Sequence, residues 1–495
     1  MPVRCILWSR SGRPLGEYME VLIHDFPQAH LKALEKTSVR GAVKRATETF
    51  NKNRTIAYSE LEDVEALKAY AATVKDHTLE HLDYYLERLA DNIEARGGQV
   101  HFAHDSADAT QIITAISRAA NAKLIVKSKS MVTEEIELNH ALEAAGMKVI
   151  ESDLGEYILQ LENENPSHLI GPAIHKPKTE VDTLFNTLFD VPLGSSADVL
   201  AAKAREIIRQ DFLNADIGIS GVNFAVAESG SIVIVENEGN ARLTTSRPRV
   251  HIAVMGLEKV IPNVHDLGVF LKLLPRAATG QRSSVFVSLI TGPKTDLEID
   301  GPEEFHLVVL DNGRSSVLAD DEMRASLRCI RCGACLNTCP VYQQLGGHAY
   351  GWVYSGPIGS VLDPALLGLP EAKSLPFASS LCGACGDVCP VKIPLPQMLV
   401  TQRTRAVSSG LMPVVETIAI KAFKNLMKTP SLYKLSSKLG RFVRWGKTMP
   451  NLGIAPLSSW QATRDFPAPN QKSFRDLWNE GLNTEAAPKL EVSND

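Results

Sequence analysis

Apolar residues recur with two different periods along the chain, and each period predicts different elements. Over residues 61–96 they recur every three to four positions, which predicts an amphipathic helix or helix pair ended by Gly97 and Gly98. Between about 100 and 310, short β-rich runs alternate with helical ones. We expect strands at 123–127, 148–151, 222–227, 231–235, 250–254, 285–289 and 306–310, and helices at 134–145 and 197–212. This alternation predicts an α/β sheet covered by helices on both faces, with a hairpin inserted into it at Glu228-Ser229-Gly230.

The pattern changes again beyond this region. Cysteines, glycines and prolines replace the strand pattern from 316 to 405, and a basic, helical pattern follows. We therefore expect five parts: an N-terminal helical extension (1–60), an α/β domain (61–315), an α-helical cysteine-bearing domain (316–405), a basic helical region (406–466) and a mobile tail (467–495). Met1 and Met19 are both possible starts.

The composition is that of a soluble globular protein. Of the 495 residues, 44% are apolar and 22% are charged, which excludes collagen-like, disordered and low-complexity classes. Charge, Gly or Pro interrupts every apolar stretch of about 20 residues, and residues 1–10 lack the apolar segment of a secretory signal. We therefore expect a cytoplasmic protein without a transmembrane helix.

The charge is unevenly distributed. The net charge is −5, yet residues 391–450 contain eleven Lys or Arg and one acid, Glu416. We expect this segment to bind an acidic partner protein or, peripherally, an anionic membrane surface. Packing against the acidic remainder of the chain is the alternative. No nucleic-acid motif or aromatic interleaving accompanies the segment, so we expect no nucleic-acid partner.

Seven of the eight cysteines fall between 329 and 389, and their spacing is that of metal ligands. The first run is Cys329-x2-Cys332-x2-Cys335-x3-Cys339-Pro340, which matches the C-x2-C-x2-C-x3-C-P run of bacterial ferredoxins. Three thiolates two residues apart lie on a tight turn around three corners of a cubane. In two-cluster proteins the fourth cysteine serves the other cluster.

The second run has the same register, but Ser379 stands where its leading cysteine is expected. Crossed ligation then predicts two iron–sulfur clusters, with the ligands Cys329, Cys332, Cys335 and Cys389 for the first and Cys339, Cys382 and Cys385 for the second. The second cluster is either [4Fe–4S] with a non-cysteine fourth ligand or [3Fe–4S]. A zinc ribbon is the alternative for the whole constellation, although zinc does not require the third cysteine of each run.

Several stretches resemble a known family. They are residues 127–131, 134–139, 153–158, 166–176, 221–230, 237–240, 346–351 and both cysteine runs. In these the chain is similar to the lactate-utilisation iron–sulfur subunits, the cluster-bearing members of a three-protein lactate oxidation system. The resemblance implies a LUD-type α/β domain, similar to the sugar-phosphate isomerase and CoA-transferase superfold, followed by an all-α ferredoxin-like domain and a helical, family-specific C-terminal region. It also implies seven cluster cysteines, so that Ser379 is no departure from the family.

A function and partners are implied by the same resemblance. The chain is expected to be an electron-transfer subunit of a cytoplasmic complex that oxidises L-lactate to pyruvate and not to turn over alone. Its partners would be a second iron–sulfur protein and a small LUD-domain protein. The alternatives are a redox- or iron-responsive ligand-binding protein and a subunit of another 2-hydroxy-acid or glycerol-phosphate oxidation complex.

The family label supplies no substrate residues, so these are read from chemistry. Lys127 and Lys129 end a strand and precede a helix, with Ser128, Ser130 and Thr133 as possible caps. A strand end that faces a helix N-terminus is where α/β sheets hold anions, so a carboxylate such as lactate is the expected ligand. The alternative is that both lysines are merely solvated.

Three further residues are candidates in the α/β domain. Glu228 lies at the predicted hairpin turn, and Arg242 belongs to a polar cluster after the second strand of the hairpin. His175, like His168, could transfer a proton near neutral pH. Exposure of the turn glutamate and backbone hydrogen bonds to the histidines are the alternatives. GxGxxG, Walker and HExxH motifs are absent, which gives nucleotide binding no support.

Overall fold

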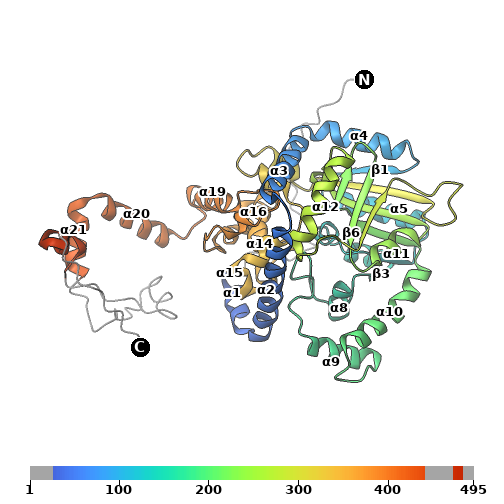
Figure 1. Cartoon of the computed structure of the whole chain (residues 1–495), viewed down its shortest axis with the longest axis horizontal. Helices are drawn as coiled ribbons and strands as arrows, with labels where there is room; N and C mark the ends of the chain where they lie inside the picture. The colour runs from blue at the N-terminus through green and yellow to red at the C-terminus, as the bar shows by residue number, and fades with distance from the viewer. Residues whose placement is uncertain (1–25, 441–471, 483–495) are drawn as a thin grey trace. The chain divides into compact units, whose positions relative to one another are not determined.

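The computed structural model describes residues 26–440 and 472–482 (Figure 1). These fall into two compact units, one that ends at Ser409 and one that begins at Gly410. Both candidate starts, Met1 and Met19, lie outside the described residues, as do residues 441–466 of the predicted basic region.

The first unit contains a six-stranded sheet in which every pairing is parallel. The strand order is β1 (Gln99–Ala103), β10 (Glu304–Leu310), β7 (Val250–Gly256), β4 (Ile217–Gly221), β2 (Leu124–Lys127) and β3 (Lys148–Glu151). The near-continuous apolar run of β7 is buried along its whole length, as a central parallel strand requires. The predicted α/β sheet is confirmed, whereas β1 and β4 were not predicted as strands.

A second, four-stranded sheet lies beside the first. Its order is β8 (Val260–Ile261), β5 (Phe224–Val226), β6 (Ser231–Glu236) and β9 (Phe286–Ile290). The predicted hairpin exists as the antiparallel pair β5 and β6, but the prediction that it inserts into the main sheet was wrong. The neighbouring strand β4 is paired on both edges, by β2 and β7, and has no edge left for the hairpin.

Helices surround the main sheet. They are α5 (Ser106–Ala119), α6 (Met131–Glu135), α7 (Leu138–Ala144), α8 (Leu154–Glu162), α9 (Lys178–Phe189), α10 (Ala197–Asn214), α11 (Asn240–Ser246), α12 (Val264–Ala278) and the short η2 (Leu257–Lys259). The single helix expected at 134–145 was wrong, because Glu137 has a left-handed backbone (φ 50°) that separates α6 from α7.

The cysteine-bearing region is built from short helices, as expected for a ferredoxin-like domain. They are α13 (Arg314–Leu318), η3 (Arg324–Arg328), α14 (Ala334–Thr338), α15 (Pro340–Leu345), η4 (His348–Tyr350), α16 (Gly356–Leu366), α17 (Leu369–Ala372), η5 (Leu375–Phe377), α18 (Ala384–Asp387) and α19 (Leu395–Ser408).

Three N-terminal helices pack on this cysteine-bearing region: α1 (Phe26–Glu35), α2 (Thr37–Ser59) and α3 (Val64–Glu80). The fourth, α4 (Leu82–Glu94), packs on β1, β8 and η2 instead. Helix α2 lies along α14 and α15 (Figure 1), and Asn51 donates a hydrogen bond to the Asn337 carbonyl at 2.8 Å. Helix α3 packs against η3. Residues far apart in sequence therefore form one core around the cysteines.

The second unit is helical where it is described. It contains α20 (Val414–Lys428), α21 (Pro430–Gly440), α23 (Phe474–Leu477) and η7 (Trp478–Leu482), and no residue of α20 is buried. The last two elements lie within the predicted tail. Throughout the described ranges 26–440 and 472–482, no helix is long and apolar enough to cross a membrane.

Candidate metal centre

The two cysteine runs form loops with the same backbone conformation. In the first loop Arg331 (φ 59°) and Gly333 (φ 71°) are left-handed, and in the second loop the equivalent Leu381 (φ 55°) and Gly383 (φ 89°) are left-handed too. Two left-handed residues on either side of a cysteine wind the chain tightly around it. Each loop then enters a short helix, α14 or α18.

Ser379 occupies in the second loop the place that Cys329 has in the first. The backbone N–H of Arg331 donates to Cys329 Sγ at 3.4 Å, and the N–H of Leu381 donates to Ser379 Oγ at 3.1 Å. Equivalent backbone amides therefore donate to both side chains. The alignment of the two runs expected from the sequence, with Ser379 at the position of Cys329, is the one that the two loops have in the structure. Ser379 is thus positioned as a thiol ligand would be.

The first cluster of thiols joins three cysteines of the first run to the last cysteine of the second. Burial raises the pKa of Cys332, and the nearby thiols of Cys389 and Cys329 raise it further. The pKa of Cys335 is raised well above its usual value by burial, then by Cys329, Cys332 and Cys389, and last by Cys385 of the second run. We call these four residues the first group.

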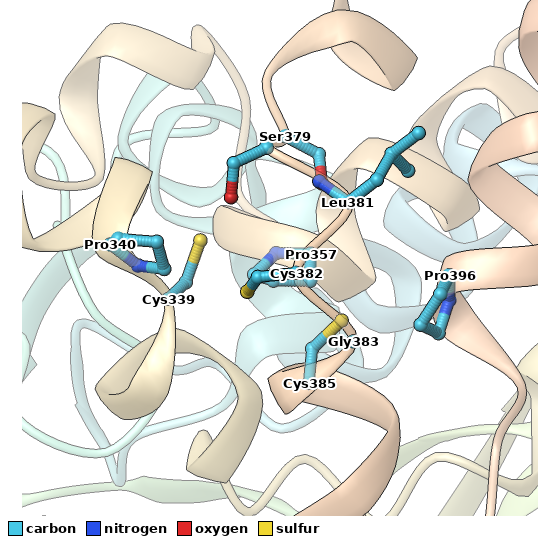
Figure 2. Close-up of a pocket in the computed structure, with 10 residues that line it drawn as sticks. Cys339, Pro340, Pro357, Ser379, Leu381, Cys382, Gly383, Cys385 and Pro396 are labelled. Atoms are coloured by element: carbon cyan, nitrogen blue, oxygen red, sulfur yellow. The ribbon is translucent and has the colours of Figure 1, made fainter. Parts of the chain in front are cut away.

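The remaining three thiols lie together, and we call them the second group. Burial raises the pKa of Cys385 to about 12, with further contributions from Cys339 and Cys382. Cys339 is affected in the same way by burial and by Cys382. All three line a shallow depression together with Ser379, whose hydroxyl points toward the Cys339 sulfur (Figure 2).

The two groups differ in nearby charge and in the exposure of one cysteine. In the second group Cys382 is exposed, whereas Cys339 and Cys385 are buried. In the first group Cys335 is half-buried, and the other three cysteines are buried. Buried cations surround the first group: Arg54 on α2, Lys68 and Lys75 on α3, Lys259 on η2 and Arg331 in the loop itself. Each of them interacts electrostatically with at least one thiol of that group.

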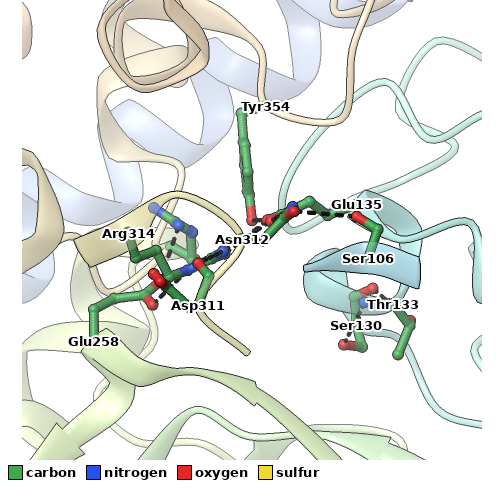
Figure 3. A network of polar contacts seen from close by, with 10 residues as sticks. Ser106, Ser130, Thr133, Glu135, Glu258, Asp311, Asn312, Arg314 and Tyr354 are labelled. Atoms are coloured by element: carbon green, nitrogen blue, oxygen red, sulfur yellow. Dashed lines mark hydrogen bonds and ion pairs between the residues drawn. The ribbon is translucent and has the colours of Figure 1, made fainter. Parts of the chain in front are cut away.

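A buried ion network joins the first loop to the carboxyl ends of the sheet strands (Figure 3). Arg314 binds both oxygens of Glu135 at 2.7 and 2.8 Å and Oε2 of Glu258 at 2.8 Å. Tyr354 donates to Glu135 at 2.6 Å. Arg331 donates to Glu258 at 3.1 Å and stacks on the Tyr354 ring, 4.4 Å from its centroid. The carboxyl edge of the sheet is therefore fixed to the cysteine-bearing region.

Lys127 lies at the end of β2, as predicted, but its ammonium already contacts two carboxylates. It is fully buried and lies 2.6 Å from Glu134 and 2.8 Å from Glu151. Burial opposes the charge, but these two carboxylates outweigh it and raise the pKa of Lys127. Lys129 instead donates to the Ile170 carbonyl at 2.6 Å. A substrate-binding role for either lysine stays a prediction.

A cavity of about 470 Å³ lies beside this cluster, between α6 to α8 and residues 348–353. Its acidic lining residues are Glu134, Glu137, Glu143, Glu151, Glu156 and Glu164. Neither carboxyl oxygen of the buried Glu156 has a hydrogen-bond partner in the structure, and the same holds for Glu151 Oε2. Burial, and then Glu151, raises the pKa of Glu156 well above its usual value. The lining disfavours an anionic ligand.

Glu228 and Arg242 lie at exposed positions. Glu228 sits in the β5–β6 turn and accepts a hydrogen bond from the Val264 amide at 3.3 Å, at the start of α12. The Arg242 guanidinium stacks over Phe286, 5.0 Å from the ring centroid. These contacts account for both side chains without a ligand, and their functional roles stay predictions.

The two histidines are buried in hydrogen-bonded loops. His175 contacts Ser167 Oγ at 2.6 Å and Glu164 at 3.1 Å, and its pKa is lowered to about 4 by burial and by His348. His168 contacts Asn337 Oδ1 at 3.0 Å, and burial lowers its pKa to about 3. A catalytic role for His175 stays a prediction, whereas His168 links its loop to the first cysteine run.

Three family models match consecutive parts of the chain. A LUD domain matches residues 86–310, a 4Fe-4S dicluster domain matches 325–393, and the model "Lactate utilisation protein B, C-terminal" matches 404–482. Lactate utilization protein B of Bacillus licheniformis is 46% identical over 469 residues, which cover 93% of this chain and 98% of that protein. The protein of the same name from Geobacillus thermodenitrificans is 48% identical over 450 residues, 90% of this chain and 94% of its own.

The chain belongs to the lactate utilization protein B family. A crystal structure of a DUF162 family protein from Deinococcus radiodurans also aligns with 46% of this chain and 98% of its own, at a TM-score of 0.26 and 14% identity. The LUD domain predicted from the sequence is confirmed by its family model. So is the iron–sulfur character of the cysteine-bearing region.

The surroundings of the first group fit an iron–sulfur cluster. Arg54 Nη1 and the Nε and Nη1 atoms of Arg331 are buried donors without a partner in the structure. Unpaired buried donors are costly, and a thiolate-ligated cluster is an anion that would accept them. The donors and the thiols thus suit the same group.

Sequence reasoning missed most of the residues around this centre. Arg331 lies inside the first cysteine run, where its position was apparent from the sequence. The other four residues belong to no motif: Lys75, Lys259 and the network partners Arg314 and Glu258. Burial of an ionised side chain is the signal that identifies them, and it is visible only in the fold.

Proposed function

We propose that this chain is an iron–sulfur electron-transfer subunit of a complex that oxidises L-lactate to pyruvate. The observation that carries the proposal is the pair of equivalent cysteine loops in a chain that belongs to the lactate utilization protein B family. A bound iron–sulfur cluster accepts and releases one electron at a time.

Two clusters with crossed ligands are part of this proposal. The first group would hold a [4Fe–4S] cluster through Cys329, Cys332, Cys335 and Cys389. The second group would hold a cluster through Cys339, Cys382 and Cys385. Its fourth ligand, if it has one, is not a cysteine, and Ser379 is in the place for it. The mutual effects of the thiols within each group support this division.

Lactate itself is held by another subunit in this proposal. The cavity beside β2 and β3 is lined by six glutamates, which would repel the carboxylate of lactate. Lys127, the best anion ligand foreseen from the sequence, is paired with Glu134 and Glu151. The family likeness and the acidic cavity together support an electron-carrying role for this chain.

A metal inventory tests the cluster assignment against zinc. Among the described residues, no three His, Cys, Asp or Glu side chains are grouped at the spacing of a single metal ion. Anaerobically purified protein should contain about seven to eight iron atoms and a matching amount of acid-labile sulfide. One zinc per chain without labile sulfide would overturn the assignment.

Reconstitution tests the lactate assignment. The chain is mixed anaerobically with the other lactate-utilisation subunits, and the visible absorption of its clusters is followed after addition of L-lactate. We expect bleaching that requires both the partners and lactate, with D-lactate and glycerol 3-phosphate as matched controls. Bleaching by glycerol 3-phosphate alone would assign the chain to a different oxidation complex.

The basic helices of the second unit are the proposed contact with those partners. Lys421, Lys424 and Lys428 are exposed on α20. Changing all three to Glu should weaken partner binding, measured from about 50 to 500 mM salt, because screening shortens the reach of exposed charges. The control changes Lys32, Lys44 and Lys52 of α1 and α2, which gives the same charge change. Loss of binding to anionic vesicles instead of partners would indicate a membrane surface.

A further inference from the structure

Two lysines beside the first group are buried without a carboxylate partner. Lys75 on α3 is 2% exposed and Lys259 on η2 is 6% exposed. The ammonium of Lys75 donates to the backbone carbonyl of Glu258. Lys259 directly follows Glu258, whose carboxylate accepts from Arg331 of the first loop, so Glu258 connects both lysines to that loop. Burial lowers the pKa of both lysines to about 8, and Glu258 and Cys329 act in the opposite direction.

The carboxylates in this part of the core do not balance the cations. Arg314 and Arg331 share Glu258, and Arg314 also binds Glu135. Lys75 and Lys259 add to the two arginines, so four buried cations face these two carboxylates and Asp363, a third buried carboxyl that interacts with Arg331. Burial raises the pKa of Asp363 well above its usual value, which disfavours its charged form. The excess positive charge lies next to the first group, in a region where little water screens it.

The second group has different surroundings. The charges that act on Cys339 and Cys385 are those of the other thiols of the group. Arg403 is the cation that contacts this loop, and it donates to the carbonyls of Pro376 and Ser379 at 2.8 and 2.9 Å. It is only partly buried. Water reaches Cys382, which is exposed.

The amide hydrogen bonds to the sulfurs do not produce this contrast. Cys389 of the first group accepts from the Ile393 and Val391 amides, and Cys339 of the second group accepts from the amides of Tyr342 and Val341. Because the loops repeat one another, this influence on a reduction potential is similar in both groups. The buried charge therefore remains as a difference between the groups, beside the fourth cysteine of the first group and the exposure of Cys382.

We propose that the buried cations Lys75, Lys259 and Arg331 raise the reduction potential of the centre at the first group. Reduction adds negative charge to a cluster that is already anionic, and unscreened positive charge nearby stabilises the reduced form. The inference rests on the proposed function, because it requires a cluster at the first group.

Anaerobic redox titration at pH 7, followed by electron paramagnetic resonance, tests this inference. Wild-type protein should show two waves. Cys382→Ser should remove one wave, which assigns that wave to the second group. In Lys75→Met and in Lys259→Met the other wave, that of the first group, should move to lower potential. The ratio of reduced to oxidised centre at a given potential should fall at least tenfold, which is a shift of about 59 mV for one electron. The wave of the second group should stay in place.

Two controls separate charge from packing. Lys75→Arg and Lys259→Arg keep the charge and should keep the wild-type potential. Lys272→Met removes an exposed lysine from α12, which packs against α3, and should move neither wave. Iron and sulfide are counted in every variant. Absence of clusters in the wild type would overturn the proposed function. Full iron content with an unmoved first-group wave, or with equal movement of the second-group wave, would overturn this inference alone.

Discussion

The two cysteine loops have nearly the same backbone but different environments. Arg331 and Leu381 adopt the same left-handed conformation, and Gly333 and Gly383 repeat it two residues later. The first loop is enclosed by buried cations and tied to the sheet through Glu258, whereas the second lies beside an exposed depression. The repeated sequence therefore reproduces the positions of the ligands. The rest of the chain determines the charge and the solvent exposure around them.

The largest effect is expected from removing the equivalent cysteine in each loop. Cys332→Ser should lose the first cluster and leave Arg54 and Lys75 buried without an anion, so we expect poor solubility and low iron content. Cys382→Ser should keep about four iron atoms and remain folded. Iron counting and circular dichroism measure both. Cys5→Ser is the control, and equal losses in the two loop variants would show that the environments do not differ as described.

A second comparison removes one arginine near each loop. Arg314→Met leaves Glu135 and Glu258 short of a partner in the core, and we expect the free energy of unfolding to fall by about 3–5 kcal/mol. Arg403→Met removes partly exposed hydrogen bonds to two carbonyls and should cost about 1 kcal/mol. Anaerobic denaturant titration gives both free energies of unfolding. Similar losses would mean that the buried network stabilises the fold no more than the hydrogen bonds of Arg403 do.

Ser379→Cys should make the loops more alike. With a fourth thiolate, the second centre should retain all its iron under mild oxidation, whereas the wild type should lose one iron and give the paramagnetic signal of a three-iron cluster. Ser380→Cys is the control, because this neighbouring serine is exposed and one residue out of register. An identical signal in Ser379→Cys and wild type would count against Ser379 as the missing ligand position.

The smallest difference in stability between the two loops is expected at the paired glycines. Gly383→Ala meets nothing within 4 Å and should cost only the strain of a left-handed alanine, about 1–2 kcal/mol. Gly333→Ala carries the same strain and would place its Cβ 3.2 Å from the His168 ring, so it should cost more. Denaturant midpoints of the two variants rank them, and the reverse order would be inconsistent with the tighter packing of the first loop.

The sequence was sufficient where a local pattern determines the structure. The cysteine spacing predicted both loops, and the buried run at 250–254 predicted the central strand. The strand β1 was missed although polar and apolar residues alternate from Gln99 to Phe102, and β4 was missed because glycines interrupt it. Nothing near Glu137 indicates its left-handed turn. The cations of the first group come from α2, α3 and η2, and no sequence period connects them to Cys329.

The ion network between the sheet and the cysteine loop has an evolutionary consequence. Glu258 belongs to the LUD part and Arg331 to the ferredoxin-like part, and each is buried against the other. A ferredoxin-like module transplanted from this chain onto another LUD domain would bring a buried arginine that lacks its carboxylate. The two modules of this chain are therefore matched to each other, and a substitution at Glu258 calls for a compensating one at Arg331.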